Sequence, residues 1–389
     1  MKPVGLVTCY YHHNYGSMLQ AYATEMIMEK IGLPYKTIAC LRPKDYMQRN
    51  VLLYIIKKIL IGDWKMWLGK KRIAQMAKKD PTFSKNQKVR NSMFDDFANN
   101  SFCVSDLARS RSELEKMAND FSAFLVGSDQ LWRTDSVEHG YFTLEWVPDH
   151  IRKIAYSTSI GVKKIPWFQV GKNRWFMNRF DFVALREQSA CDIYHELTGK
   201  TAEVVLDPTL LFTGKDWMKI QTVEPLTDGE YIFVYLLGNN PDQRDYIKNV
   251  KLATGCKIVA LLHLDDYIAS DNKYADETPF DVGPREFLNY IRNAKYVFTD
   301  SFHCSVFSIL YQKNFFTFSR FAEGARQNTN TRIDNLLNIV GLEERRWNVD
   351  KPVENALNLQ SDFSKVDDRL KGMRLKSMEY LKTALAGLE

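Results

Sequence analysis

The fold is decided by the opening stretch Val4-Gly5-Leu6-Val7-Thr8-Cys9-Tyr10, a short apolar run that ends in a polar turn. Residues 17–31 follow with apolar side chains at helical spacing, and residues 37–40 form a second apolar run. The order strand, helix, strand predicts a βαβ unit, in which the two strands are parallel neighbours. The sequence therefore predicts a parallel sheet within its first forty residues.

The alternation of strand and helix patterns continues in two successive series. The first series has strand patterns at residues 123–127, 154–157, 182–185 and 204–206, and the second, after a polar stretch near 224–230, has them at 231–237, 257–262, 296–299 and 315–318. Two such series predict an α/β protein with two doubly wound sheets that face each other across a cleft. At 389 residues the chain is long enough for two domains of ordinary size.

We expect the domains to follow this pattern. Residues 1–222 are predicted as an N-terminal Rossmann-like domain, residues 223–345 as a C-terminal Rossmann-like domain, and residues 346–389 as a tail of closing helices. Within the first domain, residues 51–79 combine aliphatic and tryptophan side chains with many lysines. This composition is typical of a helix at an anionic membrane surface, and the alternative is a helix packed on the domain with a solvated basic face.

Composition excludes several classes of protein. With 45% hydrophobic and 26% charged residues, the chain is not mostly disordered. Its net charge of +6 is spread along the sequence, which suits anionic small molecules or a membrane surface rather than nucleic acid. The six cysteines form no CxxC pair and are expected to be reduced thiols. The N-terminus has no signal-peptide pattern, so we expect a cytoplasmic protein, free or at the inner face of the membrane.

Polar residues follow the predicted strands at the edge where doubly wound sheets bind ligands. Asn14 and Gly16 come after the first strand, where a glycine allows close approach and a helix start favours an anion; a simple turn and cap is the alternative. Ser128 and Asp129 follow the strand at 123–127 and either cap a helix or contact substrate. Asp129 is also a candidate base toward a sugar hydroxyl.

Further candidates stand at three other strand ends. Arg186 is placed where a guanidinium can bind a carboxylate or phosphate with two hydrogen bonds. Asp207 precedes a proline and either forms a turn or holds Arg186. Asp300, Ser301 and His303 lead into a helix. A histidine at a helix start suits an anionic ligand or proton transfer, and the alternative is a structural histidine.

Six segments occur in a fixed order: Asn14-Tyr15-Gly16-Ser17-Met18-Leu19-Gln20-Ala21-Tyr22-Ala23, Val126-Gly127-Ser128-Asp129-Gln130-Leu131-Trp132, Tyr156-Ser157-Thr158-Ser159-Ile160-Gly161, Leu185-Arg186-Glu187, Leu206-Asp207-Pro208-Thr209-Leu210 and Thr299-Asp300-Ser301-Phe302-His303. Together they resemble the polysaccharide pyruvyl transferase family. The resemblance implies a GT-B-like fold of two Rossmann-like domains. It also implies transfer of pyruvate from phosphoenolpyruvate onto two hydroxyls of a sugar, as a cyclic ketal of a cell-surface polysaccharide.

The resemblance implies roles for individual residues. His303 is expected to contact phosphate or act as the acid, and Arg186 to anchor the carboxylate or phosphate, beside Asp129 as the third catalytic candidate. Substrate-binding residues are expected at Asn14, Gly16, Ser128, Asp207, Asp300, Ser301, Arg320 and Arg326. We expect no metal and no cofactor, with phosphoenolpyruvate as co-substrate and a sugar or lipid-linked oligosaccharide as acceptor.

One departure from the family pattern concerns the donor. Family members carry an arginine two positions before the histidine, in an Arg-Leu-His-Gly pattern, whereas this chain has Ser301-Phe302-His303-Cys304. If phosphoenolpyruvate is the donor, then Arg320, Arg326 or Arg332 is expected to supply the missing charge near His303.

Two functions from other classes are compatible with the same strand ends. A GT-B-like glycosyltransferase would place Asp300, Ser301 and His303 around the diphosphate of a nucleotide sugar. A non-catalytic sugar-binding member would keep the fold and lack the acid. Thermal stabilisation by phosphoenolpyruvate is expected for a pyruvyl transferase, and stabilisation by nucleotide sugars for a glycosyltransferase.

Overall fold

The computed structural model describes residues 1–40, 81–162, 164–263, 268–271, 274–320 and 331–388, together with residues 53, 56, 57, 59, 60 and 75. Most of the predicted basic segment 51–79, including its tryptophans, lies outside the described residues, and so does Arg326.

The first sheet contains six parallel strands in the order β2-β1-β3-β4-β5-β6. The strands are β1 (Val4–Val7), β2 (Tyr35–Thr37), β3 (Ala123–Val126), β4 (Arg152–Thr158), β5 (Phe182–Leu185) and β6 (Glu203–Val204). The helices of this part are α1 (Tyr15–Ile31), α5 (Pro81–Ser101), α6 (Arg111–Met117), α7 (Thr134–Val137), α8 (Val170–Asn178) and α9 (Gln188–Thr198). All residues of β1 and β3 are buried, as expected for central strands of a sheet covered on both faces.

The second sheet contains four parallel strands in the order β10-β9-β7-β8. The strands are β7 (Tyr231–Tyr235), β8 (Lys257–Ala260), β9 (Tyr296–Thr299) and β10 (Asn314–Thr317). The helices are α10 (Gly214–Met218), which precedes the sheet, then α11 (Pro241–Thr254), α12 (Pro284–Asn293), α13 (Phe302–Leu310), α14 (Thr331–Val340) and α15 (Val353–Asn358). In each sheet the second strand in chain order lies at one edge, beside the first strand, and the third and fourth strands follow on the other side of the first. Both sheets thus contain the flavodoxin-like order 2-1-3-4.

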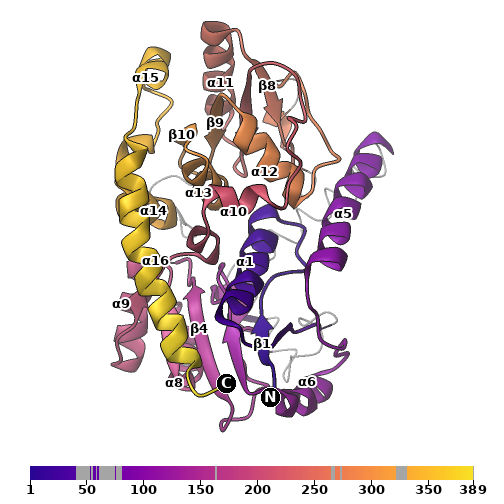
Figure 1. Ribbon diagram of the computed structural model, residues 1–389, viewed down its shortest axis with the longest axis vertical. Helices are drawn as coiled ribbons and strands as arrows, with labels where there is room; N and C mark the ends of the chain where they lie inside the picture. The colour runs from indigo at the N-terminus through magenta and orange to yellow at the C-terminus, as the bar shows by residue number, and fades with distance from the viewer. Residues whose placement is uncertain are drawn as a thin grey trace.

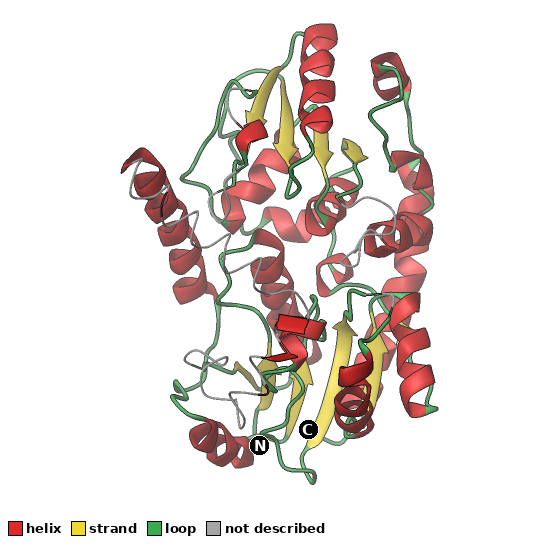
Figure 2. Ribbon diagram, turned by 180° about the vertical axis from the view of Figure 1, so that it is seen from behind, coloured by secondary structure: helices red, strands yellow, loops and turns green. Residues whose placement is uncertain are grey.

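The two sheets lie at opposite ends of an elongated molecule, with α1, α10 and α13 between them (Figure 1). The last helix, α16 (Phe363–Leu385), runs along one side from the second sheet back to the first (Figures 1 and 2). It is fixed to the first sheet by the hydroxyl of Tyr380, which donates to the carbonyl of Ala155 at 3.0 Å. The chain therefore ends close to where it began, near the foot of the first sheet.

The predicted fold class is confirmed, and the differences lie in the bounds of elements: β2 covers Tyr35–Thr37, whereas the sequence predicted a strand at 37–40. Helix α13 starts at Phe302, because the side chain of Ser301 accepts a hydrogen bond from the backbone N–H of Cys304 and caps the helix there. The chain passes from one sheet to the other between β6 and β7, and the boundary at residue 222 stays a prediction. Among the described residues, no helix is both long and apolar enough to cross a membrane.

Candidate active site

The order of strands reverses at one place in each sheet, between β1 and β3 and between β7 and β9. Ligands of doubly wound sheets bind beyond the carboxyl ends of the strands at such points. Here the two points face the same cavity of about 290 Å³, called the first cavity below. Its wall includes residues that follow β1, β3, β7 and β9, together with Arg320 and Arg332. Both domains therefore contribute to one candidate site.

His303 lies where the two domains meet. It is the second residue of α13, it lines the first cavity, and its Nε2 atom is 3.5 Å from Oδ2 of Asp207. Gly16, at the start of α1 in the other domain, packs against the imidazole, and a Cβ atom at that position would collide with the ring. A glycine is needed at residue 16 because the helix backbone has to approach the histidine this closely.

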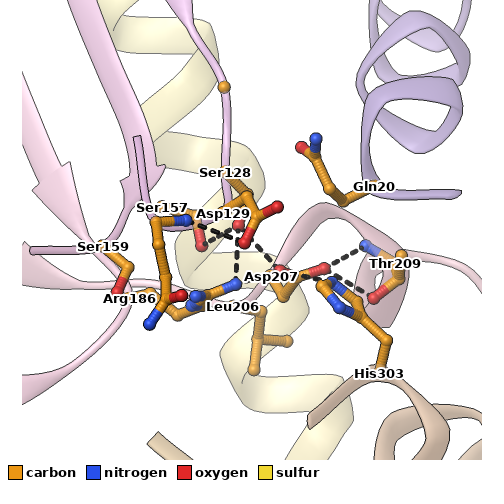
Figure 3. A network of polar contacts seen from close by, with 12 residues as sticks. Gln20, Ser128, Asp129, Ser157, Ser159, Arg186, Leu206, Asp207, Thr209 and His303 are labelled. Carbon is orange, nitrogen blue, oxygen red and sulfur yellow. Dashed lines mark hydrogen bonds and ion pairs between the residues drawn. The ribbon is translucent and has the colours of Figure 1, made fainter. Parts of the chain in front are cut away.

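Asp207 is the centre of a buried polar network (Figure 3). Its Oδ2 atom accepts hydrogen bonds from Ser128 Oγ at 2.7 Å and from Arg186 Nη1 at 3.1 Å. Its Oδ1 atom accepts from the backbone and the hydroxyl of Thr209 at 3.0 and 2.6 Å. Burial acts to raise the pKa of Asp207, but His303 and Arg186 outweigh it and hold this pKa well below its usual range. Asp207 is therefore an ionised, fixed partner for His303.

Asp129 follows β3 in an unusual backbone conformation, with a φ of 83°. Its Oδ2 atom accepts a hydrogen bond from Ser17 Oγ at 2.6 Å, and its Oδ1 atom accepts from the N–H of Gln130 at 2.8 Å. Burial acts to raise the pKa of Asp129, but Arg186, His303 and Ser17 together lower it. The carboxylate is thus ionised on the wall of the first cavity, where it can accept a hydrogen bond from a hydroxyl.

Three arginines also reach the first cavity, Arg133, Arg320 and Arg332. Arg133 forms an ion pair with Asp135 at 3.2 Å. The side chain of Arg332 is buried, and among the described residues it has no carboxylate within ion-pair distance and no hydrogen-bond partner for Nε. Burial and the nearby charge of Arg186 lower the pKa of Arg332 to about 9, so that it remains charged near neutral pH. Arg320 donates to the carbonyl of Asp300 at 3.0 Å. The cavity therefore has a cationic wall that suits an anionic ligand.

A family model described as polysaccharide pyruvyl transferase matches residues 14–320. The chain belongs to the polysaccharide pyruvyl transferase family. This membership makes the protein a transferase, and the match includes His303 and Arg320 of the cavity wall but ends before Arg332. A comparison with curated proteins finds no match.

Solved structures support the fold of this family member. A UDP-N-acetylglucosamine 2-epimerase is similar with a TM-score of 0.56 at 10% sequence identity, over 99% of this chain and 95% of that one. The enzyme of the same name from Neisseria meningitidis, bound to UDP-GlcNAc, is similar with a TM-score of 0.50 at 11% identity, over 97% of this chain and 100% of that one. At such low identities the similarity shows the GT-B-like fold alone.

In this pyruvyl transferase family member, the predicted site residues fall into two layers. The wall of the first cavity contains Asn14, Asp129, Ser301, His303 and Arg320. The layer behind it contains Gly16, Ser128, Arg186, Asp207 and Asp300, which do not line the cavity. For these five residues a direct role in catalysis or substrate binding stays a prediction, and in the structure each contacts its neighbours behind the wall.

Asp300 and Arg186 illustrate these contacts. The carboxylate of Asp300 accepts hydrogen bonds from the N–H groups of Leu237 and Gly238, both at 2.7 Å, and so shapes the loop after β7. The guanidinium of Arg186 binds Asp207, and its Cζ atom lies 4.6 Å from the centre of the Phe302 ring. Both side chains position wall residues rather than forming the wall.

Other wall residues were not predicted from the sequence. Arg133, Asp135 and His139 come from the segment after β3, beyond the resembling motif, and Ser17 was part of a motif but was given no role. The sequence could have indicated these wall residues only by a strand end followed by a run of polar residues. An ordinary turn has the same pattern, so the pattern does not identify a site.

Proposed function

We propose that the protein transfers a pyruvyl group from phosphoenolpyruvate onto two hydroxyls of a sugar in a cell-surface polysaccharide precursor, as a cyclic ketal. One observation carries the proposal: Arg320 and Arg332 lie in the same cavity as His303 although residue 301 is a serine. The charge that the family pattern places at residue 301 is thus available from two residues further along the chain. Arg332 suits an anion best, because it is buried without a carboxylate among the described residues.

His303 is proposed as the acid. Its proton adds to the methylene carbon of phosphoenolpyruvate, and a sugar hydroxyl bonds to the adjacent carbon. The bond from that carbon to the phosphate oxygen then breaks, and inorganic phosphate leaves with the proton of that hydroxyl. A second hydroxyl closes the ring, and its proton returns to the imidazole. The carboxylate of Asp207, 3.5 Å from Nε2, holds the imidazole in position for the transfer. Arg320 and Arg332 hold the carboxylate and phosphate of the donor during these steps. This chemistry moves protons and phosphate, so phosphoenolpyruvate is proposed as the sole co-substrate.

The wall that faces the arginines is proposed to hold the acceptor. Asp129 and Gln130 follow β3 there, and an ionised carboxylate can accept the proton of an attacking hydroxyl. The lowered pKa of Asp129 makes it a weak base, so its main contribution is the orientation of the hydroxyl. The acceptor is proposed to be a sugar or a lipid-linked oligosaccharide that the protein meets in the cytoplasm, at the inner face of the membrane.

The direct test is a transfer assay with the full chain, phosphoenolpyruvate and a panel of oligosaccharides. We expect release of inorganic phosphate together with an acceptor that has gained one pyruvate ketal, detected by mass spectrometry. The variant His303→Gln should abolish both signals while binding phosphoenolpyruvate. Phosphate release without ketal formation, or full activity of His303→Gln, would reject the assignment.

A nucleotide sugar is the competing donor, favoured by the GT-B-like fold and by the bound UDP-GlcNAc of the Neisseria meningitidis neighbour. Thermal unfolding with each compound separates the two donors, since a ligand of the native state raises the unfolding temperature. Stabilisation by UDP-sugars, with no effect of phosphoenolpyruvate, would replace the proposed function by glycosyl transfer.

A further inference from the structure

A second cavity of about 210 Å³ lies beside the first. Its wall comes from the start of α1, from α5, and from the residues that follow β7 and β8. Asn14 and Leu237 line both cavities, so the two are neighbours. None of the groups proposed for the chemical steps lines the second cavity.

Arg90, on α5, is the most informative residue of this wall. Its side chain is more than nine-tenths buried, with 7% of its surface exposed. Its Nη1 and Nη2 atoms donate to the carbonyls of Leu262 and Pro279 at 2.6 and 3.0 Å, and Nε has no hydrogen-bond partner among the described residues. No carboxylate of the described part of the chain forms an ion pair with it. A buried cation without a counter-ion is unfavourable, and an anionic ligand would supply one.

His263 lies on the same wall, just after β8. Its Nδ1 atom is 2.6 Å from Oδ2 of Asp271, and Oδ1 of Asp271 accepts from Arg244 Nη2 at 2.6 Å. Burial acts to raise the pKa of Asp271, but His263 and Arg244 lower it, so the carboxylate is ionised. Asp271 fixes the imidazole in place, and the negative charge of Asp271 is balanced by Arg244.

Two acidic side chains of neighbouring described elements have partners of their own. Asp95 of α5 binds Nε2 of His13 at 2.8 Å, and Glu286 of α12 accepts from the N–H of Gly283 at 2.9 Å. The amide side chain of Asn91 completes the polar part of the wall. The described wall of the second cavity therefore combines the guanidinium of Arg90 with hydrogen-bond donors, which is the arrangement that binds phosphate and carboxylate groups.

We propose that the second cavity binds a negatively charged group, a phosphate or a carboxylate, which the acceptor carries at a distance from its reacting hydroxyls. The inference rests on the proposed function, because that function defines the acceptor. The shared wall at Asn14 and Leu237 lets one sugar place its hydroxyls in the first cavity and its anionic group in the second. The preferred acceptor is thus a sugar phosphate or an acidic sugar rather than a neutral sugar.

Calorimetric binding to the full chain, without phosphoenolpyruvate, tests the proposal. The probes are glucose 1-phosphate, glucuronic acid and neutral methyl glucoside. We expect at least one anionic probe to bind about tenfold or more tightly than the neutral one, and the preferred probe identifies the source of the charge as phosphate or carboxylate. Equal affinity for all three probes would overturn the proposal.

Matched variants assign the binding to the second cavity. Asn91→Asp keeps the side-chain shape but adds a negative charge to the wall. It is expected to lower the affinity for the anionic probe about tenfold. Asn99→Asp makes the same change on an exposed part of α5 that does not line the cavity, and should have no effect. A second pair compares Arg90→Gln with Arg285→Gln, in which Arg285 contacts Phe97 of α5 outside the cavity.

The two proposals fail in different ways. If Arg332→Gln loses probe binding while Asn91→Asp and Arg90→Gln keep it, the anion binds in the first cavity and this inference is overturned. Binding of phosphoenolpyruvate is expected to depend on Arg332 and not on Asn91. If phosphoenolpyruvate does not bind while the anionic probe still depends on Asn91, the proposed donor is wrong and the second anion site stands.

Discussion

The ring of Phe302 lies beside two buried guanidinium groups, with Cζ of Arg186 at 4.6 Å and Cζ of Arg332 at 5.8 Å from its centre. A cation near an aromatic ring is favourable, but two like charges so close to each other are not. Arg186 is balanced by Asp207, whereas Arg332 has no carboxylate within ion-pair distance in the described part of the chain. Arg332 thus lacks a direct ion-pair partner among the described residues, at the place where the proposed donor would bring a negative charge.

The first prediction concerns this arginine. Arg332→Gln should weaken the binding of phosphoenolpyruvate by about 100-fold, which corresponds to about 2.7 kcal/mol, because a charge-assisted pair is lost. The free energy of unfolding of the unliganded protein should stay the same or rise, since an unpaired buried charge has been removed. Calorimetry and urea unfolding measure the two effects.

Arg346→Gln is the matched control for that prediction. Arg346 forms an ion pair with Asp334 at 2.9 Å and donates to the carbonyl of Phe318 at 2.7 Å, so its loss should lower stability and leave donor binding intact. Equal loss of donor binding in both variants would show that Arg332 acts through general charge and not through contact.

The second prediction concerns the contact between Gly16 and His303. Gly16→Ala should displace the imidazole and lower kcat by about 10-fold to 100-fold, because a small misplacement of a catalytic group is costly. Gly171→Ala on α8 is the control, since a Cβ there meets no neighbour within 4 Å and alanine favours a helix by about 0.5–1 kcal/mol. Unchanged kcat in a folded Gly16→Ala protein would remove His303 from the reaction or show that the two helices separate during it.

At the scale of elements, the turn after β6 depends on one carboxylate. Asp207 caps the short helix at Pro208–Leu211, and it also holds Arg186 and faces His303. Since the folded-state pKa of Asp207 is lowered, its contribution to stability is present above the unfolded-state value of about 4. It is lost progressively as the pH falls below that value.

The third prediction follows from the direction of this pH dependence. Asp207→Asn should lower the free energy of unfolding at pH 7 by about 3–5 kcal/mol, because Arg186 is left buried without its partner. The difference from the unsubstituted protein should shrink near pH 3, as measured by urea unfolding at both pH values. Asp216→Asn, which removes a partly exposed helix cap, should cost only about 1 kcal/mol at pH 7. If Asp207→Asn lowers the free energy of unfolding by the same amount at both pH values, the argument is contradicted.

Strands such as β5 and β9 have the bounds predicted from the sequence, because each is a buried apolar run with polar residues at its carboxyl end. The division of site residues into wall and supporting layer could not be predicted in the same way. Asp129 and Asp207 both follow a strand and both resemble a cap, and only the left-handed backbone at Asp129 and the packing around Asp207 distinguish them.

The second cavity was also beyond prediction. Arg90 reaches it from α5, whereas the carbonyl that it binds on Leu262 is 172 positions away along the chain. A periodic pattern identifies the buried face of a helix but not the element against which that face packs. Contacts between distant segments therefore have to come from the structure.

At the scale of the whole molecule, the apolar core is continuous between the two sheets. One cluster of buried residues includes Leu6 and Leu125 of the first sheet and Phe233 and Val297 of the second. Interfaces between domains of one chain are usually more polar than this and allow the domains to move independently. The continuous core indicates that the domains are stabilised together.

The last prediction tests that coupling at Trp217 of α10, which lies between the sheets. Its side chain is fully buried, its ring lies 5.0 Å from that of Phe307 in the second domain, and it also contacts Tyr22 of the first domain. Trp217→Ala should cost about 3–5 kcal/mol of unfolding free energy. Because the core is shared, calorimetry should show one transition in both proteins, with equal calorimetric and van 't Hoff enthalpies. If the variant instead unfolds in two separate steps, or if the original protein already does, the domains are stabilised separately and His303 owes its position beside Gly16 to local contacts alone.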